Sequence, residues 1–269
     1  MHGQAPTIST KELYAQLGTA AAPVVIDARK RDAFDADDRL IVGAVRYDFD
    51  ANTEGSKNLP ADGPVILYCA HGAEVSQTAA TELQEAGINA AYLTGGIAAW
   101  RAQNLPTRQK VSMPTNKWVT RERPKIDRIA CPWLIRRFVD PAAVFLFVKA
   151  SEVLGVGERF EATPFDIEGV HWSHRGEKCT FDIMVEEFGL ATTPLLRLAA
   201  IVRGADTARL DLAPEAPGLL AASLGLSRMY DDDLAQLEAG MFLYDAFYRW
   251  CRDATTETHN WPTNKPRGS

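Results

Sequence analysis

The chain has 269 residues, a formal net charge of −6 and a pI near 5.5. This acidic balance argues against direct nucleic-acid binding, which usually leaves a basic footprint. The N-terminus has no apolar signal core, and no apolar run reaches transmembrane length. The four cysteines form no CxxC pair, which favours reduced thiols. We therefore expect a cytoplasmic protein without a membrane partner.

The first part of the chain alternates helical patterns with apolar runs, and this order is typical of an α/β domain with a parallel sheet. Capping and periodicity predict helices, and continuous apolar runs predict buried strands. The segments, in chain order, are a helix over 9–18, strands within 23–29 and 64–70, a helix over 76–87 and a strand within 90–96. Ligands of such sheets bind beyond the carboxyl ends of the strands.

A polar stretch with two prolines follows, and the pattern then changes to one strand at 117–123 and mainly helices. Pro132 is expected at the first position of one helix, which would place Cys131 at its N-cap. These boundaries predict two domains, with a mainly helical α+β fold for the second. The predicted segments are 1–108 for the α/β domain, 109–117 for the linker, 118–255 for the second domain and 256–269 for a flexible tail.

Cys69 lies where a predicted strand ends and a short loop leads into a helix. Loop amides and a helix N-terminus lower the pKa of a thiol, so this position suits a nucleophile. Gly72 permits a tight loop with inward-facing amides. A buried structural cysteine is equally compatible with the spacing.

This part of the sequence resembles the rhodanese domain over roughly residues 5–108. The resemblance rests on "DAR" at 27–29, Gly43-Ala44, "YCAHGAEVSQTAA" from Tyr68 and "GGIAAW" at 95–100. It implies that Cys69 accepts a sulfane sulfur as a persulfide from a small sulfur donor and passes it to an acceptor thiol. It further implies an anion-holding loop made of Ala70, His71, Gly72, Ala73, Glu74 and Val75.

Asp27 and Arg29 match a supporting pair in that family, and we interpret them first as a buried ion pair. Glu74 stands where many active rhodaneses carry an arginine. A carboxylate there would raise the pKa of the cysteine and repel thiosulfate, although a protonated His71 could offset it. We therefore expect weak activity with thiosulfate, and use of another persulfide donor or a docking role for the loop.

Polar groups gather in the second half of the chain. Glu238 and Asp245 are seven residues apart beside the apolar stripe of a helix, so both are expected to be partly buried. A divalent metal ion, zinc, iron or manganese, would compensate them, with His174 and Asp206 as further ligands. Ion pairs with arginines would do so without a metal, and both interpretations stay open. The candidate arginines are Arg128, Arg175 and Arg203.

The second half resembles the C-terminal domain of chromate-resistance proteins of the ChrB type. The resemblance spans about residues 117–253 and rests on "KIDRIACPWLIRRFVDP", "PFDIEGV", "HRGEKCTFD", "LLRLAAIVRGADT" and "LGLSRMYDDDLAQLEAGMFLYDAFYRWC". It implies protection against chromate, with a sensing role in members that carry a different N-terminal domain.

These resemblances and residue patterns suggest two alternative functions for the protein. The first is a chromate or metal-stress resistance protein with a sulfurtransferase-type cysteine and a second domain that binds a metal ion, chromate or another oxyanion. The alternative is a non-enzymatic, chromate-responsive regulatory protein with a vestigial rhodanese module.

Overall fold

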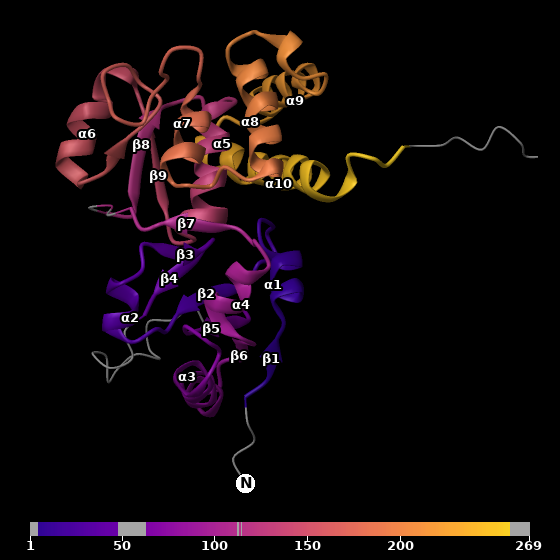
Figure 1. The fold of residues 1–269 in the computed structure, drawn as a ribbon. Helices are drawn as coiled ribbons and strands as arrows, with labels where there is room; N and C mark the ends of the chain where they lie inside the picture. Colours follow the sequence, from indigo (N-terminus) through magenta and orange to yellow (C-terminus); the bar gives the residue numbers. More distant parts are fainter. Residues whose placement is uncertain (1–4, 48–62, 112, 114, 259–269) are drawn as a thin grey trace, which may run out of the picture.

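The computed structural model describes residues 5–47, 63–111, 113 and 115–258 (Figure 1). In the first part, five parallel strands form one sheet in the order β1-β6-β5-β2-β4. The strands are β1 (Thr7–Ile8), β2 (Val24–Asp27), β4 (Ala44–Arg46), β5 (Val65–Tyr68) and β6 (Ala90–Leu93). The helices are α1 (Thr10–Gln16), α2 (Arg31–Asp35), α3 (Glu74–Glu85) and α4 (Gly96–Ala102). The predicted α/β fold with a parallel sheet is confirmed.

Local chemistry explains the elements that carry the first site. Ser9 caps α1 in a capping box with Glu12, which satisfies two backbone N–H groups at the start of the helix. Every residue of β5 is buried, as a central parallel strand requires. The register pairs Asp27 with Tyr68, the residue before Cys69. This register brings the ends of β2 and β5 together.

The second part combines a small parallel sheet, in the order β10-β8-β9, with helices. The strands are β8 (Lys117–Arg121), β9 (Val144–Val148) and β10 (Thr163–Pro164). The α-helices are α5 (Asp127–Leu134), α6 (Val153–Phe160), α7 (Thr180–Glu187), α8 (Thr193–Asp206), α9 (Ala216–Met229) and α10 (Asp233–Arg249). The mainly helical α+β prediction is confirmed, but β9 was not predicted, because a short apolar run can belong to a strand or a helix.

Helix α5 begins at Asp127, four residues before Cys131. The prediction that Cys131 is the N-cap of this helix was therefore wrong. Asp127 is its first residue, so Cys131 and Pro132 lie inside the helix and are buried. Proline cannot donate to the carbonyl four residues before it, and the helix continues as a π-helical turn over Ile135–Val139. Tertiary burial of this segment outweighs the preference of proline for a first turn.

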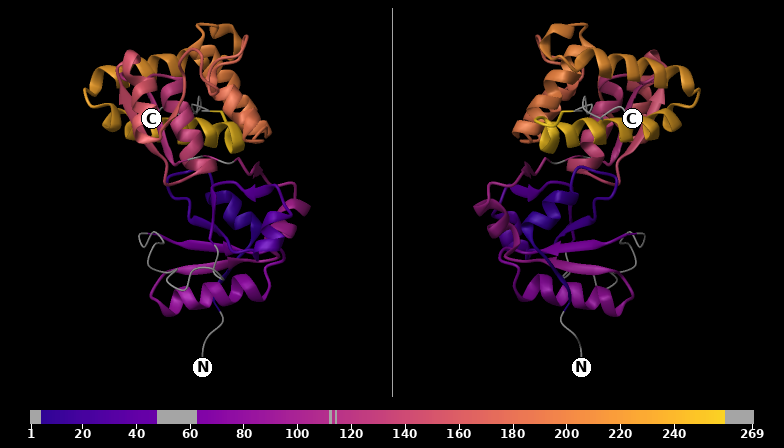
Figure 2. Two further views of the ribbon diagram at one scale, coloured as in Figure 1. Left: turned by 90° about the vertical axis from the view of Figure 1, so that its left-hand side faces the viewer. Right: turned by 90° about the vertical axis from the view of Figure 1, so that its right-hand side faces the viewer.

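The two parts pack on each other around a continuous apolar core that includes Leu13, Trp100, Trp133 and Tyr248. Figure 2 shows the parts one above the other, with the last helical turns of the described chain at the junction. Arg252 in these turns donates to the carbonyls of Tyr14 and Leu17.

Strands β3 (Arg39–Ile41) and β7 (Thr107–Gln109) pair antiparallel beside this junction. The Gln109 N–H donates to the carbonyl of Phe188, so the predicted linker starts in a segment that contacts both parts. Most of the predicted flexible tail lies outside the described residues. Within the described chain, the helices are too short or too polar to cross a membrane.

Candidate functional sites

Cys69 lies in the loop between β5 and α3, beyond the carboxyl end of the central strand. Its side chain is 5% exposed, and the Ser76 hydroxyl lies 3.2 Å from the sulfur. Burial raises the pKa of the Cys69 thiol. The Ser76 hydroxyl and the backbone N–H groups of Ser76, His71 and Ala73 lower it by a larger amount, so the pKa lies below its ordinary value. Glu74, which was expected to raise this pKa, is not among its main causes.

The surroundings of the other three thiols raise their pKa values instead of lowering them. Cys131, Cys179 and Cys251 are buried, and burial is the main cause that raises the pKa of each, to about 11 in Cys251. Nearby carboxylates raise the pKa values of Cys131 and Cys179 further. A thiolate at neutral pH is therefore favoured at Cys69 over the other three positions.

Limited alkylation with iodoacetamide at neutral pH is expected to modify Cys69 first. The rate should rise with pH around a midpoint below that of an ordinary thiol, because the thiolate is the nucleophile. Peptide mass spectrometry over a pH series measures both properties. Earlier labelling of Cys131, Cys179 or Cys251 would contradict the assignment.

The residues from Cys69 to Val75, which include the loop and the start of α3, differ in their exposure. Gly72 and Cys69 are buried, whereas His71, Ala73 and Glu74 are exposed; Ala70 and Val75 are intermediate. Glu74 is the first residue of α3, where a carboxylate complements the helix dipole. Its charge therefore acts on the sulfur through solvent, where it is partly screened.

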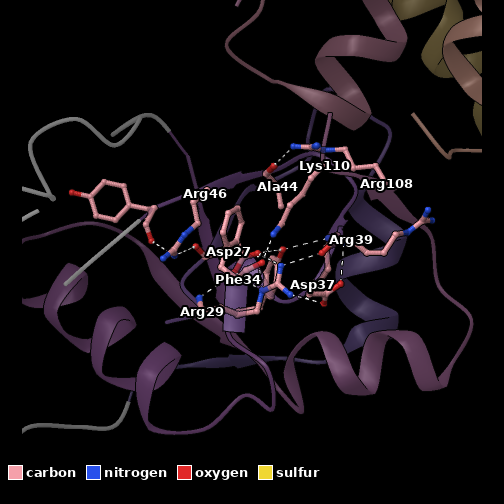
Figure 3. A network of polar contacts seen from close by, with 12 residues as sticks. Asp27, Arg29, Phe34, Asp37, Arg39, Ala44, Arg46, Arg108 and Lys110 are labelled. Atoms are coloured by element: carbon pink, nitrogen blue, oxygen red, sulfur yellow. Dashed lines mark hydrogen bonds and ion pairs between the residues drawn. The ribbon is translucent and has the colours of Figure 1, made fainter. Parts of the chain in front are cut away.

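Asp27 and Arg29 form a buried ion pair beneath this end of the sheet (Figure 3). The guanidinium lies 2.5 Å from an Asp27 carboxylate oxygen and 2.6 Å from Asp37. The Tyr68 hydroxyl donates to the same Asp27 carboxylate at 2.9 Å. Because Tyr68 precedes Cys69, the pair fixes the strand end that carries the cysteine.

A second cluster lies in the other part of the chain, around His174. The Nε2 atom of His174 lies 3.2 Å from Asp206 Oδ2, so the structure brings these two predicted ligands together. The same nitrogen lies 3.4 Å from Asp127 Oδ2 and 3.4 Å from Asp166 Oδ1, two residues that the sequence reasoning did not select. We call these four residues the His174 cluster.

Four separate segments supply the His174 cluster. Asp127 begins α5, Asp166 follows β10, His174 lies in the loop before α7 and Asp206 ends α8. Ile126 and Asp166 have φ angles of 40° and 53°. This left-handed backbone is costly for a β-branched residue such as Ile126, so the surrounding structure must hold it in place.

Burial and neighbouring charges shift the pKa values of the His174 cluster in opposite directions. Asp127 is completely buried, and this burial raises its pKa to about 7 although His174 lowers it. Hydrogen bonds to Asp127, Asp166 and Asp206 raise the pKa of His174 to about 12. The pKa of Asp166 is lowered, because hydrogen bonds from His174 and Thr180 and the charges of Arg121 and Arg128 outweigh its burial.

Glu238 and Asp245, which were predicted to join His174, have other partners. Glu238 is 63% exposed and pairs with Arg136, so its predicted burial was wrong. Asp245 is buried, but it accepts hydrogen bonds from Arg137 and from the Trp133 indole. Both arginines lie in the π-helical turn after α5, which the sequence could not place beside α10. The three arginines that were proposed as partners of Glu238 and Asp245, namely Arg128, Arg175 and Arg203, form ion pairs with other carboxylates.

Residues 9–103 match the rhodanese-like domain family, and residues 118–251 match the family of the ChrB C-terminal domain. The chain joins a rhodanese-like domain to a ChrB C-terminal domain. Protein ChrB of Cupriavidus metallidurans is 33% identical over 175 residues, which cover 64% of this chain and 52% of that protein. The chain thus spans about half the length of this relative.

The thiosulfate sulfurtransferase GlpE of Coxiella burnetii is 32% identical over 82 residues, 30% of this chain and 74% of that protein. Among solved structures, a rhodanese-related protein of Thermoplasma volcanium is 26% identical; the match covers 38% of this chain and 96% of that chain, with a TM-score of 0.34.

Proposed function

We propose that this protein protects a cell against chromate or related metal stress, with persulfide chemistry at Cys69 and a metal ion in the ChrB C-terminal domain. The persulfide part rests on the place of Cys69 between β5 and α3, where the Ser76 hydroxyl lies 3.2 Å from the sulfur and the loop amides lower the pKa of the thiol. The four cysteines are unpaired, which suits a reducing cytoplasm. Chromate or another oxyanion is the proposed stress signal or substrate.

Sulfur transfer would begin with attack of the Cys69 thiolate on the outer sulfur of a donor persulfide. The sulfur–sulfur bond of the donor breaks, the donor leaves as a thiolate, and Cys69 becomes a persulfide. The loop N–H groups that stabilise the Cys69 thiolate would also stabilise the anionic persulfide. An acceptor thiolate then removes the outer sulfur and restores Cys69.

The test is to incubate the protein with thiosulfate, glutathione persulfide and cysteine persulfide, and to read the mass of the Cys69 peptide. A gain of one sulfur atom at Cys69, removed by a thiol acceptor and absent in Cys69→Ser, supports the proposal. If no donor loads Cys69 in folded protein, the rhodanese-like domain is a non-enzymatic module, and a regulatory role of the whole chain becomes the better proposal.

Glu74→Arg is expected to increase sulfur transfer from thiosulfate by roughly fivefold, or on the order of 1 kcal/mol in the barrier. The charge reversal attracts an anionic donor, but exposure of Glu74 limits the gain through screening. Steady-state assays at low and high ionic strength measure the effect, which should shrink with salt.

Glu82→Arg provides a matched control, because it makes the same charge reversal later on α3, two turns from the start of the helix. An equal gain in both variants would show that net charge, and not the position of Glu74, controls donor use.

A further inference from the structure

We infer that Asp127, His174 and Asp206 together bind one divalent transition-metal ion beside Asp166, with part of its coordination shell open to an adjacent cavity. The inference rests on the proposed metal-binding role of the ChrB C-terminal domain and assigns that role to one site. A single imidazole with several carboxylates suits Mn²⁺, Fe²⁺ or Zn²⁺, whereas Ca²⁺ and Mg²⁺ favour sites made of oxygen alone.

The spacing of the ligand atoms matches a coordination shell. The three distances from His174 Nε2 to carboxylate oxygens are 3.2, 3.4 and 3.4 Å. Two ligands that each lie about 2.1 Å from an ion are about 3.0 Å apart at an octahedral edge and about 3.4 Å apart at a tetrahedral one. The ligand atoms of Asp127, His174 and Asp206 also lie within 4.8 Å of one another, so one ion of ordinary bond length fits among these three residues.

Hydrogen bonding alone does not account for this arrangement. The N–H at His174 Nε2 points in one direction, yet oxygens of three different carboxylates surround that atom at similar distances. A cation bonds to several ligands at once, which an N–H group cannot do. The neutral imidazole would then offer its lone pair to the ion.

An unsatisfied buried atom provides a second, independent observation. Asp127 is 0% exposed, and within the described chain its Oδ1 atom has no hydrogen-bond partner. Its Oδ2 atom accepts hydrogen bonds from the Thr180 and Phe181 N–H groups, which orient the carboxylate. A buried carboxylate oxygen without a donor is costly, and an ion bound through both oxygens of Asp127 would supply the missing partner of Oδ1.

Neighbouring side chains hold Asp166 in a fixed orientation beside the other residues of the cluster. The Thr180 hydroxyl donates to Asp166 Oδ1 at 2.9 Å, and Arg121 and Arg128 pair with Asp166 Oδ2. These contacts position Asp166 and offset part of its charge. Such support usually changes metal affinity when it is removed.

A cavity of about 750 Å³ opens beside the cluster. His174 and Asp166 form part of its wall, together with Arg121, Ser151 and Ser173. His174 is 42% exposed and lines this cavity, whereas Asp127 is 0% exposed and does not. Structural metal sites are usually closed, and sites that bind substrate keep an open position. The ion is therefore expected to retain exchangeable water.

The experiment uses full-length protein treated with a chelator and then titrated with Mn²⁺, followed by electron paramagnetic resonance and water-proton relaxation. We expect one bound Mn²⁺ per chain with enhanced relaxation from bound water. His174→Lys keeps a positive charge among the carboxylates but cannot act as the same ligand. It should fold and bind Mn²⁺ at least about 100-fold more weakly.

Asp206→Asn should weaken Mn²⁺ binding to a similar extent, and because Asp206 is partly exposed it provides a second test if His174→Lys does not fold. Glu238→Gln removes a distant, exposed carboxylate and should bind as the wild type does.

Wild-type Mn²⁺ affinity in folded His174→Lys and Asp206→Asn would overturn this assignment while leaving a metal-binding role elsewhere. Absence of any Mn²⁺ and Zn²⁺ binding by the wild type would overturn both the site and the metal-binding role. Bound Mn²⁺ without exchangeable water would overturn the open position. Sulfur loading of Cys69 is measured separately and tests the other half of the proposed function.

Discussion

Gly96→Ala is expected to destabilise the protein by about 3–5 kcal/mol and to abolish sulfur loading of Cys69. Gly96 has a φ of 58°, and a Cβ atom there would lie 2.3 Å from the Cys69 carbonyl oxygen and 2.6 Å from the Gly72 nitrogen. Both contacts are with backbone, so no side-chain rotation can relieve them. The start of α4 would have to move away from the cysteine loop.

This movement would remove hydrogen bonds that hold the loop. The Ile97 N–H donates to the Cys69 carbonyl, and the Ala98 N–H donates to the Ala70 carbonyl, each at 3.0 Å. Urea denaturation followed by circular dichroism measures the stability, and peptide mass spectrometry measures sulfur loading.

Gly87→Ala is the matched control. Gly87 has a φ of 85°, but a Cβ atom there would meet nothing within 4 Å. It should cost only about 1–2 kcal/mol from the left-handed backbone and leave sulfur loading intact. Equal effects of the two substitutions would show that the contact between α4 and the cysteine loop is unimportant.

Arg29→Met is expected to destabilise the protein by about 3–5 kcal/mol, because it leaves the Asp27 carboxylate buried without its cation. Arg29 is 2% exposed and Asp27 is 0% exposed. The Tyr68 hydroxyl and the backbone N–H of residue 29 still donate to Asp27, but neutral donors cannot fully compensate a buried charge. Because Tyr68 precedes Cys69, sulfur loading should also decrease.

The double variant Asp27→Asn/Arg29→Met should be less destabilised than the sum of its two single variants, since the uncompensated charge is gone. Lys178→Met breaks an exposed ion pair with Glu186 and should change stability by about 0–1 kcal/mol. Urea midpoints of the four variants measure these differences. Additive effects of Asp27→Asn and Arg29→Met would contradict a direct interaction between the two charges.

The rhodanese-like site could be predicted because its parts are adjacent in the chain. The strand that ends at Tyr68, Cys69, the loop glycine and the following helix form one continuous segment. A strand followed by a tight loop and a helix forces the loop amides toward the same point, whatever the rest of the protein does. The exposure of Glu74 was not predictable from that segment, because it depends on how α3 packs.

The His174 cluster could be predicted only in part. His174 and Asp206 stand in polar runs, but nothing in their spacing connects them with Asp127 or Asp166. Asp127 was missed because proline preferences moved the expected start of α5 toward Pro132. The common face of Glu238 and Asp245 followed from helical periodicity, but their partners, Arg136 and Arg137, come from a distant turn.

The sequence by itself determined the parallel sheet and the position of Cys69, because these depend on local order and on the period of apolar residues. The two domain families followed from the resemblance of its motifs to those families. Only the tertiary structure decided which charged groups meet. Asp127, Asp166, His174 and Asp206 come together through the packing of α5, α7 and α8. Contacts between distant segments depend on that packing, and local sequence patterns do not predict it.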